Sequence, residues 1–395
     1  MVANTSVIYL AGPQVDSAEA VELAQQQGFD QAMLLGRRGY QVGWITHDQS
    51  EISSPPLDGI KEQWHNMDAI MMPGFFEHQI DQHQSEIEQS KALTQQILEG
   101  DSGDEVFAKP PYSERLTPKF ELLGASYDES DPQEIETLDF DVMDGDDIIA
   151  EGLWVKLSWL SFIEDDESLR FRFSFGIVGY EDVAADYQRQ CFAAELTEAI
   201  FPESSLVSTN KALQSLLADT LDVNQVDYVE RIIYFNAPQG GAQFHQDVER
   251  GHLGVVYAQL QGRTGWVALS KQKLIDEILT FMSTADAQEA YLASINNDDA
   301  WEKLAEITQD RDQLNSYLDE PDNEPLEYLL NRVPKFTQQL VEHGYAYILN
   351  PGDVILLPQK DQNDCCWHTV FCLDQFAGQA LSFAIRATPD NYEGS

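Results

Sequence analysis

Two histidines and an aspartate have the residue types and the order that suit a metal site. His245 and Asp247 are separated by one residue in the run FHQD, and His368 follows Trp367 far downstream. Side chains two positions apart on a strand point to the same face, so His245 and Asp247 could reach one ion. Two imidazoles and a carboxylate leave three octahedral positions open, which suits iron(II). The sequence therefore predicts a metal site formed by His245, Asp247 and His368.

Each part of this pattern also has a simpler explanation. A His-x-Asp pair is nearly expected by chance in a chain with 8 histidines and 68 acidic residues, and His368 could be a core or edge histidine. The neighbouring sequence favours metal ligands. Gly240-Gly241 suits a tight turn before the pair. The run PGDVILLP at 351–358 predicts a turn, a strand and a turn that return the chain to the sheet.

Eight short strands are expected around these residues. Their ranges are 229–236, 242–247, 254–260, 265–269, 345–349, 354–357, 366–371 and 381–386. Acidic, helical sequence at 271–343 interrupts them as an insert, which could form a lid or an oligomer contact. Short strands separated by Gly and Pro turns predict an α+β fold whose core is a jelly-roll of two sheets. A hairpin of 153–163 and 169–178, with alternating Phe and polar residues, would extend one sheet.

The first 150 residues contain no motif that indicates a function. Apolar runs at 6–11 and 39–45 predict strands, and a helix is expected over 17–27. The stretch 127–147 is strongly acidic, which predicts an exposed loop or a linker. We therefore expect an N-terminal accessory α/β region, 1–150, and a jelly-roll domain with its helical insert, 151–395.

Four motifs in order give the chain a family resemblance. The runs FHQD, YAQLQG, NPGDVILLP and WH, within 229–388, resemble the Fe(II)/2-oxoglutarate-dependent oxygenases, most of all their JmjC-type and cupin-like branch. The resemblance implies a double-stranded β-helix (jelly-roll) core, Fe(II) held by His245, Asp247 and His368, and 2-oxoglutarate as cosubstrate. It also implies hydroxylation of a C–H bond in an amino-acid, peptide or protein side chain. Demethylation would use the same chemistry, and no catalytic residue beyond the metal ligands is expected.

The distal carboxylate of 2-oxoglutarate needs a basic partner, preferably one that donates two hydrogen bonds. Arg386 is the first candidate, because it ends the last expected strand and many branches of the family have an arginine there. The JmjC-type branch usually has a lysine shortly after a Gln-x-x-Gly turn, but the matching residue is Thr264, with Arg263 beside it. Either Arg386 or Arg263 therefore binds the carboxylate, or the cosubstrate differs.

Two polar residues on the strand before the metal pair could also contact the cosubstrate. Tyr234 and Asn236 share one face of that strand, and they could equally be packing residues. The missing lysine supports a second hypothesis, a cupin-like metal-binding sensor or scaffold without oxygenase activity.

The charge of the chain limits its partners. With 23 basic and 68 acidic residues, the net charge of −45 argues against binding to nucleic acid or to an anionic membrane. It is typical of a solvated acidic surface, and it would also favour a basic substrate. The four cysteines show no disulfide spacing, and neither a signal peptide nor a membrane-spanning run is evident. We therefore expect a soluble, cytoplasmic protein of undetermined oligomeric state.

Overall fold

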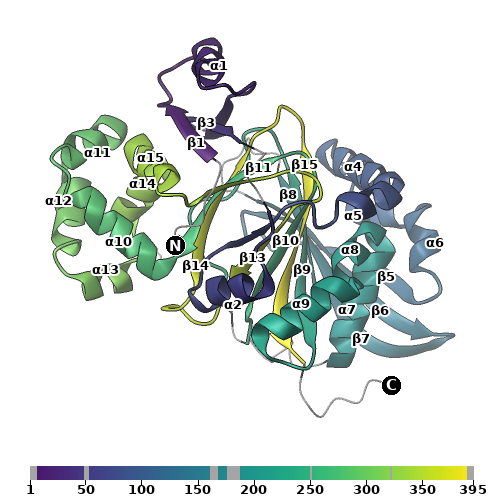
Figure 1. The fold of residues 1–395 in the computed structure, drawn as a ribbon. Coiled ribbons are helices and arrows are strands. Elements are labelled where there is room, and N and C mark those ends of the chain that lie inside the picture. Colours follow the sequence, from purple (N-terminus) through teal and green to yellow (C-terminus); the bar gives the residue numbers. More distant parts are fainter. Residues whose placement is uncertain are drawn as a thin grey trace.

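The computed structural model describes residues 7–48, 53–160, 168–175, 187–249, 251–320 and 323–388. Its centre is a nine-stranded antiparallel sheet that faces a smaller antiparallel sheet (Figure 1). The expected mixture of helices with a large antiparallel sheet is thus confirmed. In spatial order the large sheet contains β4 (Ile70–Met72), β13 (Val354–Pro358), β10 (Gly254–Gln261), β15 (Gly378–Ala387), β9 (Val226–Asn236), β8 (Leu169–Phe175), β7 (Asp147–Trp159), β6 (Glu134–Asp144) and β5 (Phe120–Ser126).

The small sheet carries part of the metal site predicted from the sequence. It contains β12 (Ala346–Leu349), β11 (Thr264–Ser270) and β14 (Cys366–Cys372) in that order. The segment before Asp247 lies beside β14 but joins it through an isolated bridge between His245 and His368. From β9 to β15 the chain therefore passes repeatedly between the two sheets.

The prediction of a strand at 242–247 was wrong, because the backbone there is irregular and has only an isolated bridge at His245. At Gly241 the backbone φ is +128°, and a Cβ there would lie 2.1 Å from the Val370 carbonyl oxygen. Only glycine can bring the chain this close to β14 at that angle. The irregular segment that follows still keeps its hydrogen bonds to β14, so it positions His245 without being a strand.

Alternating side chains divide the sheets into two cores. The face between the sheets is filled by buried residues of β10, β11, β13 and β14, among them Val255, Tyr257, Trp266, Ile355 and Leu357. The opposite face of the large sheet carries Val256, Leu356, Leu381 and Phe383, which pack against helices. This alternation is what the two-residue period of a strand produces when both faces are covered.

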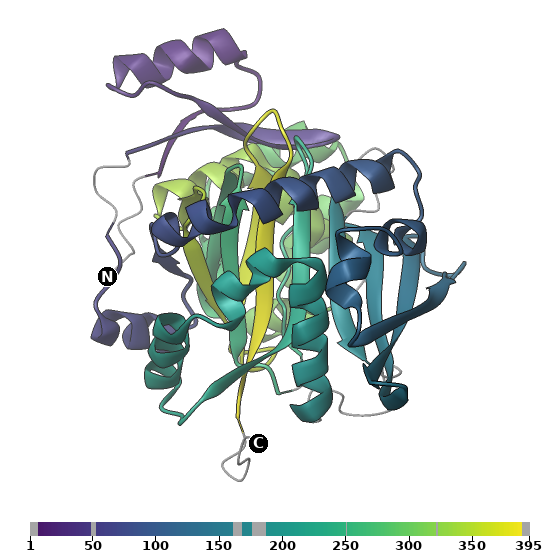
Figure 2. The ribbon, with the colours of Figure 1, turned by 90° about the vertical axis from the view of Figure 1, so that its right-hand side faces the viewer.

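Helices cover the outer face of the large sheet (Figure 2). One further helix from the first part of the chain, α1, packs against strand β1 (Val7–Ala11) instead. These helices and 3-10 turns are α1 (Ser17–Gln26), α2 (Leu57–His65), α3 (Glu77–Ile80), η2 (Asp81–His83), α4 (Gln84–Leu98), α5 (Gly103–Phe107), α6 (Tyr112–Leu116), α7 (Tyr187–Ile200), η4 (Pro202–Ser204), α8 (Ser205–Ser208) and α9 (Lys211–Leu221). None of the helices in the described ranges has both the length and the hydropathy needed to cross a membrane.

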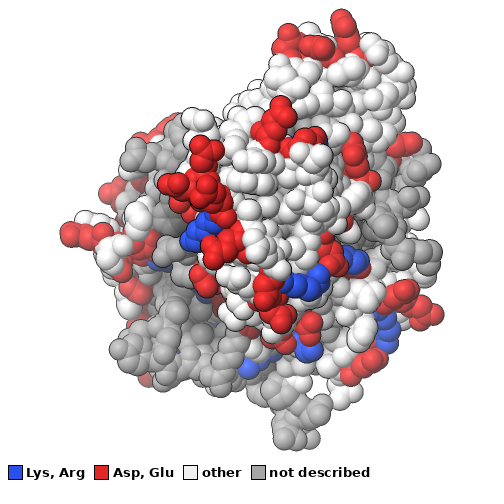
Figure 3. Space-filling model, turned by 90° about the vertical axis from the view of Figure 1, so that its left-hand side faces the viewer, with Lys and Arg blue, Asp and Glu red and all other residues white. Residues whose placement is uncertain are grey.

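Six more helices pack against the outer face of the small sheet, on the left of Figure 1. They are α10 (Lys271–Met282), α11 (Ala287–Ile295), α12 (Asp298–Ile307), α13 (Arg311–Tyr317), α14 (Glu324–Arg332) and α15 (Pro334–Glu342). On this side of the molecule acidic side chains are more widespread than basic ones (Figure 3). The insert contributes Asn331 to the metal site, as described below.

The expectation of a loop at 127–147 agrees with the irregular, mostly exposed backbone at 127–133 but was wrong for Glu134–Asp144. Strand β6 lies there, because Leu138, Phe140 and Val142 alternate with polar residues and are fully buried. Asp139 and Asp141 lie on the other face, whereas Glu136 lies on the same side as Leu138 and accepts a hydrogen bond from the Gly103 N–H. This mixture hides the strand period in the composition. The division expected at residue 150 falls within β7, and the large sheet is continuous across it through the β6–β7 pair.

A separate small sheet forms at the N-terminus. It contains β1 (Val7–Ala11), β3 (Tyr40–His47) and β2 (Met33–Arg37), in that spatial order. The turn between β2 and β3 reaches the segment before the metal pair, where the Arg38 N–H donates to the Gln239 carbonyl. The N-terminal region thus takes part in building the site.

A buried glutamate joins the helical layer to the large sheet and should make stability depend on pH. Glu203 accepts hydrogen bonds from Ser90 Oγ at 2.6 Å and Gln379 Nε2 at 2.5 Å, and burial raises its pKa. In the unfolded chain the Glu203 carboxyl has its ordinary pKa of 4.5, so it loses its proton at a lower pH than in the folded chain. A rise in pH above 4.5 therefore lowers the free energy of unfolding. Glu203→Gln should remove that loss. Urea unfolding of the wild type and the variant at pH 5 and pH 8 measures this effect. Compared with the wild type, the variant should be more stable at pH 8 than it is at pH 5.

Candidate metal centre

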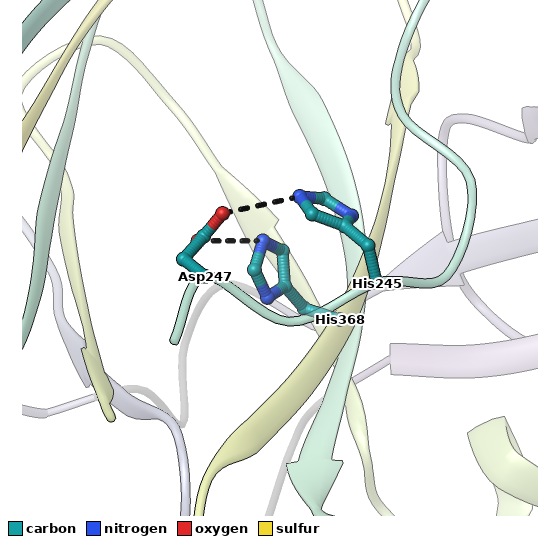
Figure 4. Close-up of side chains that lie close together, drawn as sticks. All are labelled: His245, Asp247 and His368. Carbon is teal, nitrogen blue, oxygen red and sulfur yellow. Dashed lines mark ion pairs between the residues drawn. The ribbon is translucent and has the colours of Figure 1, made fainter. Parts of the chain in front are cut away.

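Three side chains from two distant segments converge on one point. The Nε2 atoms of His245 and His368 lie 3.5 Å from Oδ1 and Oδ2 of Asp247, respectively. The two imidazole rings are 4.2 Å apart between centroids. All three candidate ligand atoms lie within 4.8 Å of one another, and the side chains point toward a common centre (Figure 4).

Backbone pairing places the two histidines side by side. The His245 N–H donates to the His368 carbonyl at 3.0 Å, and the His368 N–H donates back at 2.9 Å. His245 Nδ1 lies 2.7 Å from the Gln243 carbonyl. A carbonyl only accepts, so Nδ1 carries the proton and Nε2 keeps the lone pair that a metal needs. The ring of Trp266 stacks on His368 with 5.4 Å between centroids.

A buried arginine from the N-terminal sheet holds the segment that carries His245. Arg37 Nη1 donates to the Ala242 carbonyl and to Thr369 Oγ1, the latter at 2.5 Å. Its Nη2 donates to Asn331 Oδ1 at 3.0 Å, and the Phe244 N–H donates to the same oxygen at 2.8 Å. Arg37 thereby ties together β2, β14, α14 and the segment before His245. The sequence offered no local sign of this role, because these contacts span more than 200 residues.

The electrostatics of the centre favour an ionised Asp247 and a neutral His368 imidazole. Burial alone would raise the pKa of Asp247, but His368 and His245 hold it well below its usual range. Burial, together with His245, lowers the pKa of His368 to about 3, so this imidazole is neutral near pH 7. Burial also acts to lower the pKa of His245, but Asp247 outweighs it and raises that pKa. A metal ion would replace the proton on His245.

A cavity of about 680 Å³ borders the three residues. The side chains of His245 and Asp247 are 40% and 36% exposed, whereas that of His368 is 4% exposed. One side of the centre is thus open to the cavity and the other is closed by the small sheet. Polar residues from β8, β9 and the β2–β3 turn line the cavity, including Arg37, Arg38, Arg170, Arg172, Glu230, Tyr234 and Asn236.

The donor set fits iron(II) with open coordination positions. Two neutral imidazole nitrogens and one carboxylate oxygen occupy one face of the centre, and the cavity lies on the accessible side. Three ligands of this kind are typical of iron sites that also bind small molecules. Asp247 is ionised, and a metal ion would take the place of the proton that Asp247 favours on His245.

The residues predicted to contact a cosubstrate lie in different places. Tyr234 and Asn236 line the cavity, and Asn236 Nδ2 donates to the Tyr257 hydroxyl at 3.3 Å. Arg386 is not among the described cavity-lining residues. It lies beside Gly251, where an added Cβ would be 2.9 Å from its Nη2. Thr264 is buried and donates its hydroxyl to Gln259 Oε1 at 2.9 Å.

Arg263 is held away from the cavity. Its Nη2 lies 2.6 Å from Asp374 Oδ1, and its Nη1 donates to Gln31 Oε1 at 2.8 Å. The backbone direction of β11 thus sends this side chain toward the N-terminal sheet, and the sequence spacing alone could not show that.

Arg263→Gln should therefore leave ligand binding at the metal centre unchanged. The ion pair with Asp374 is largely buried, so its loss should lower the free energy of unfolding by about 1 to 3 kcal/mol. Iron binding and chemical denaturation of the variant check both statements. A large loss of ligand binding would show that Arg263 reaches the cavity after all.

A second group of potential ligands lies in the same cavity but is already neutralised. Glu230, Glu249 and His252 are close enough to hold an ion. Arg172 forms ion pairs with Glu230 and with Glu249, the latter at 3.8 Å. Burial raises the pKa of Glu230 to about 7 and lowers that of His252. The arginine occupies the place of a cation, so we do not assign a second metal site here.

Comparisons with known proteins give structural similarities only. Neither a family model nor a curated protein matches the sequence. An oxidoreductase of the 2OG-Fe(II) oxygenase family from Burkholderia pseudomallei is 9% identical, with a TM-score of 0.28 over 84% of this chain and 91% of its own. YcfD, a ribosomal oxygenase from Escherichia coli, is 14% identical, with a TM-score of 0.23 over 73% of this chain and 44% of its own. TM-scores this low do not establish a shared fold, so the proposals below rest on this chain's own residues.

Proposed function

We propose that this chain is an Fe(II)/2-oxoglutarate-dependent oxygenase that hydroxylates a C–H bond of an amino-acid, peptide or protein side chain. The convergence of His245, Asp247 and His368 at the border of a large polar cavity carries the proposal. A structural metal site would be closed by a fourth protein ligand, whereas this centre has three ligands and an open side.

The topology supports a double-stranded β-helix, or jelly-roll, as the core. Strands β9, β10, β13 and β15 lie together in the large sheet, and β11, β12 and β14 form the small one. The segment at His245 pairs with β14 as a fourth member of the small sheet. This alternation gives two facing four-membered layers, with the metal ligands on adjacent segments of one layer.

The chain's own groups have distinct parts in this function. His245, Asp247 and His368 would hold the iron, which with 2-oxoglutarate and oxygen supplies the oxidising chemistry. Tyr234 and Asn236 line the cavity and would donate hydrogen bonds to a bound ligand. The ring of Trp266 and the closed side of the small sheet keep water away from His368.

The charges of the cavity argue against the basic substrate that the acidic composition favoured. Four arginines and three carboxylates line it, namely Arg37, Arg38, Arg170 and Arg172 with Glu230, Asp247 and Glu249. A bound divalent ion would add two positive charges, which the two carboxylates of 2-oxoglutarate would offset, so the cavity would keep its small excess of positive charge. A neutral or acidic side chain is therefore the better match, even though the chain as a whole carries a charge of −45.

Anaerobic titration of the iron-loaded protein with 2-oxoglutarate tests the proposal. A visible charge-transfer band should appear as the 2-oxoacid binds the iron, and succinate should form once oxygen is admitted. Iron binding without a band or succinate would overturn the proposal and favour the alternative, a cupin-like metal-binding sensor or scaffold.

A further inference from the structure

Two arginines of the cavity, Arg170 and Arg172, belong to β8, a strand outside the two layers of the proposed jelly-roll. Strand β8 pairs with β9, and Arg170 lies opposite Tyr234 in their register. Both residues line the cavity, and Arg170 is close enough to Tyr234 to influence its pKa, as is the metal ligand Asp247. A neighbouring strand of the extended sheet therefore brings a guanidinium to the site.

Arg170 differs from Arg37 and Arg172 in its partners. Its Nε donates to Ser158 Oγ at 2.7 Å, and its Nη2 donates to Gln133 Oε1 at 3.2 Å. Both partners are uncharged, and within the described part of the chain no carboxylate lies within ion-pair distance of Arg170. In contrast, Arg172 is paired with Glu230, and Arg37 is buried among fixed acceptors. Arg170 thus lines the cavity without a direct ion pair among the described residues, and neutral partners already set its orientation.

Such a group is well suited to a carboxylate. A guanidinium binds carboxylates through parallel hydrogen bonds, and an arginine held in place beforehand loses little entropy on binding. The other candidates for this role are less well placed, since Arg263 pairs with Asp374 and the position of the usual lysine is a buried threonine, Thr264. Arg386 lies beside Gly251 rather than on the described cavity wall.

We propose that Arg170 binds the distal carboxylate of 2-oxoglutarate, with the Tyr234 hydroxyl as a second donor. This inference rests on the proposed function and assigns the cosubstrate specificity to a strand outside the jelly-roll core. Arg170 would add a preset guanidinium to the positive charge that the other arginines and a bound iron give the cavity.

The test compares two 2-oxoacids by anaerobic titration of the iron-loaded full chain. 2-Oxoglutarate and 2-oxobutyrate share the group that binds iron, but only the first has a distal carboxylate. In the wild type, 2-oxoglutarate should bind more tightly. Arg170→Gln should raise the Kd for 2-oxoglutarate by about 10- to 100-fold, as expected for a charge-assisted pair, and leave that for 2-oxobutyrate unchanged. Arg170→Lys should recover part of the preference.

Controls separate this role from folding and from the proposed function. Arg263→Gln changes a matched arginine outside the cavity and should keep the preference for 2-oxoglutarate. Arg170→Gln should bind iron itself as tightly as the wild type does. An unchanged preference in Arg170→Gln, equal weakening of both acids, or loss of the preference in Arg386→Gln would overturn the inference alone. An iron-loaded wild type that gives no band with either acid would overturn the proposed function as well.

Discussion

Asp247→Ala should abolish tight iron binding and all turnover of 2-oxoglutarate. The variant loses the only carboxylate among the three candidate ligands and leaves two neutral imidazoles. Loss of a partner that merely orients a metal ligand already costs about 10- to 100-fold in affinity, so loss of a ligand should cost more than about 100-fold. Iron content after dialysis, and succinate formation at saturating iron, measure the two effects.

Glu249→Ala is the matched control for this variant. It removes another carboxylate from the same cavity, at an exposed position near Arg172. Its iron content should stay at that of the wild type. If Asp247→Ala retained iron while Glu249→Ala lost it, the ion would belong to the group of Glu230, Glu249 and His252 instead.

Arg37→Met should destabilise the protein and loosen the metal centre together. The methionine keeps much of the apolar stem but loses the hydrogen bonds to Ala242, Thr369 and Asn331. Bonds from a charged donor contribute more than neutral ones, but Ala242 and Asn331 retain other donors. We expect a loss of about 3 kcal/mol in the free energy of unfolding and an iron affinity lower by about tenfold. Urea unfolding and iron titration measure these losses.

Arg38→Met is the matched control for Arg37→Met. Arg38 is half-buried at the cavity rim, and Arg38→Met should change the free energy of unfolding by less than about 1 kcal/mol. Similar iron affinity in Arg37→Met and in the wild type, despite a lower stability, would limit Arg37 to a structural role.

Much of the chemistry follows from local sequence. The pair His245-x-Asp247 and the Trp367-His368 step identify donors of the right kind, and the structure brings these donors together. The ranges of the strands from β9 to β15 were also close to those expected, because two-residue alternation and Gly or Pro turns are properties of neighbouring residues. The irregular segment before Asp247 and strand β6 were the main errors.

The tertiary structure decided which arginines meet the metal centre. Arg263 is next to the matching position in sequence but points toward Asp374, while Arg37 and Arg170 come from segments without a motif. Their positions depend on how β2 packs against β14 and on how β8 extends the large sheet beyond β9.

The sequence by itself determined the types of the candidate ligands and the strand periods, since both depend on residues a few positions apart. Only the tertiary structure decided where the buried charges lie and what compensates them. The contacts of Arg37 with Thr369 and Asn331 join residues 332 and 294 positions apart, and a local sequence pattern contains no information about which distant partner binds a guanidinium.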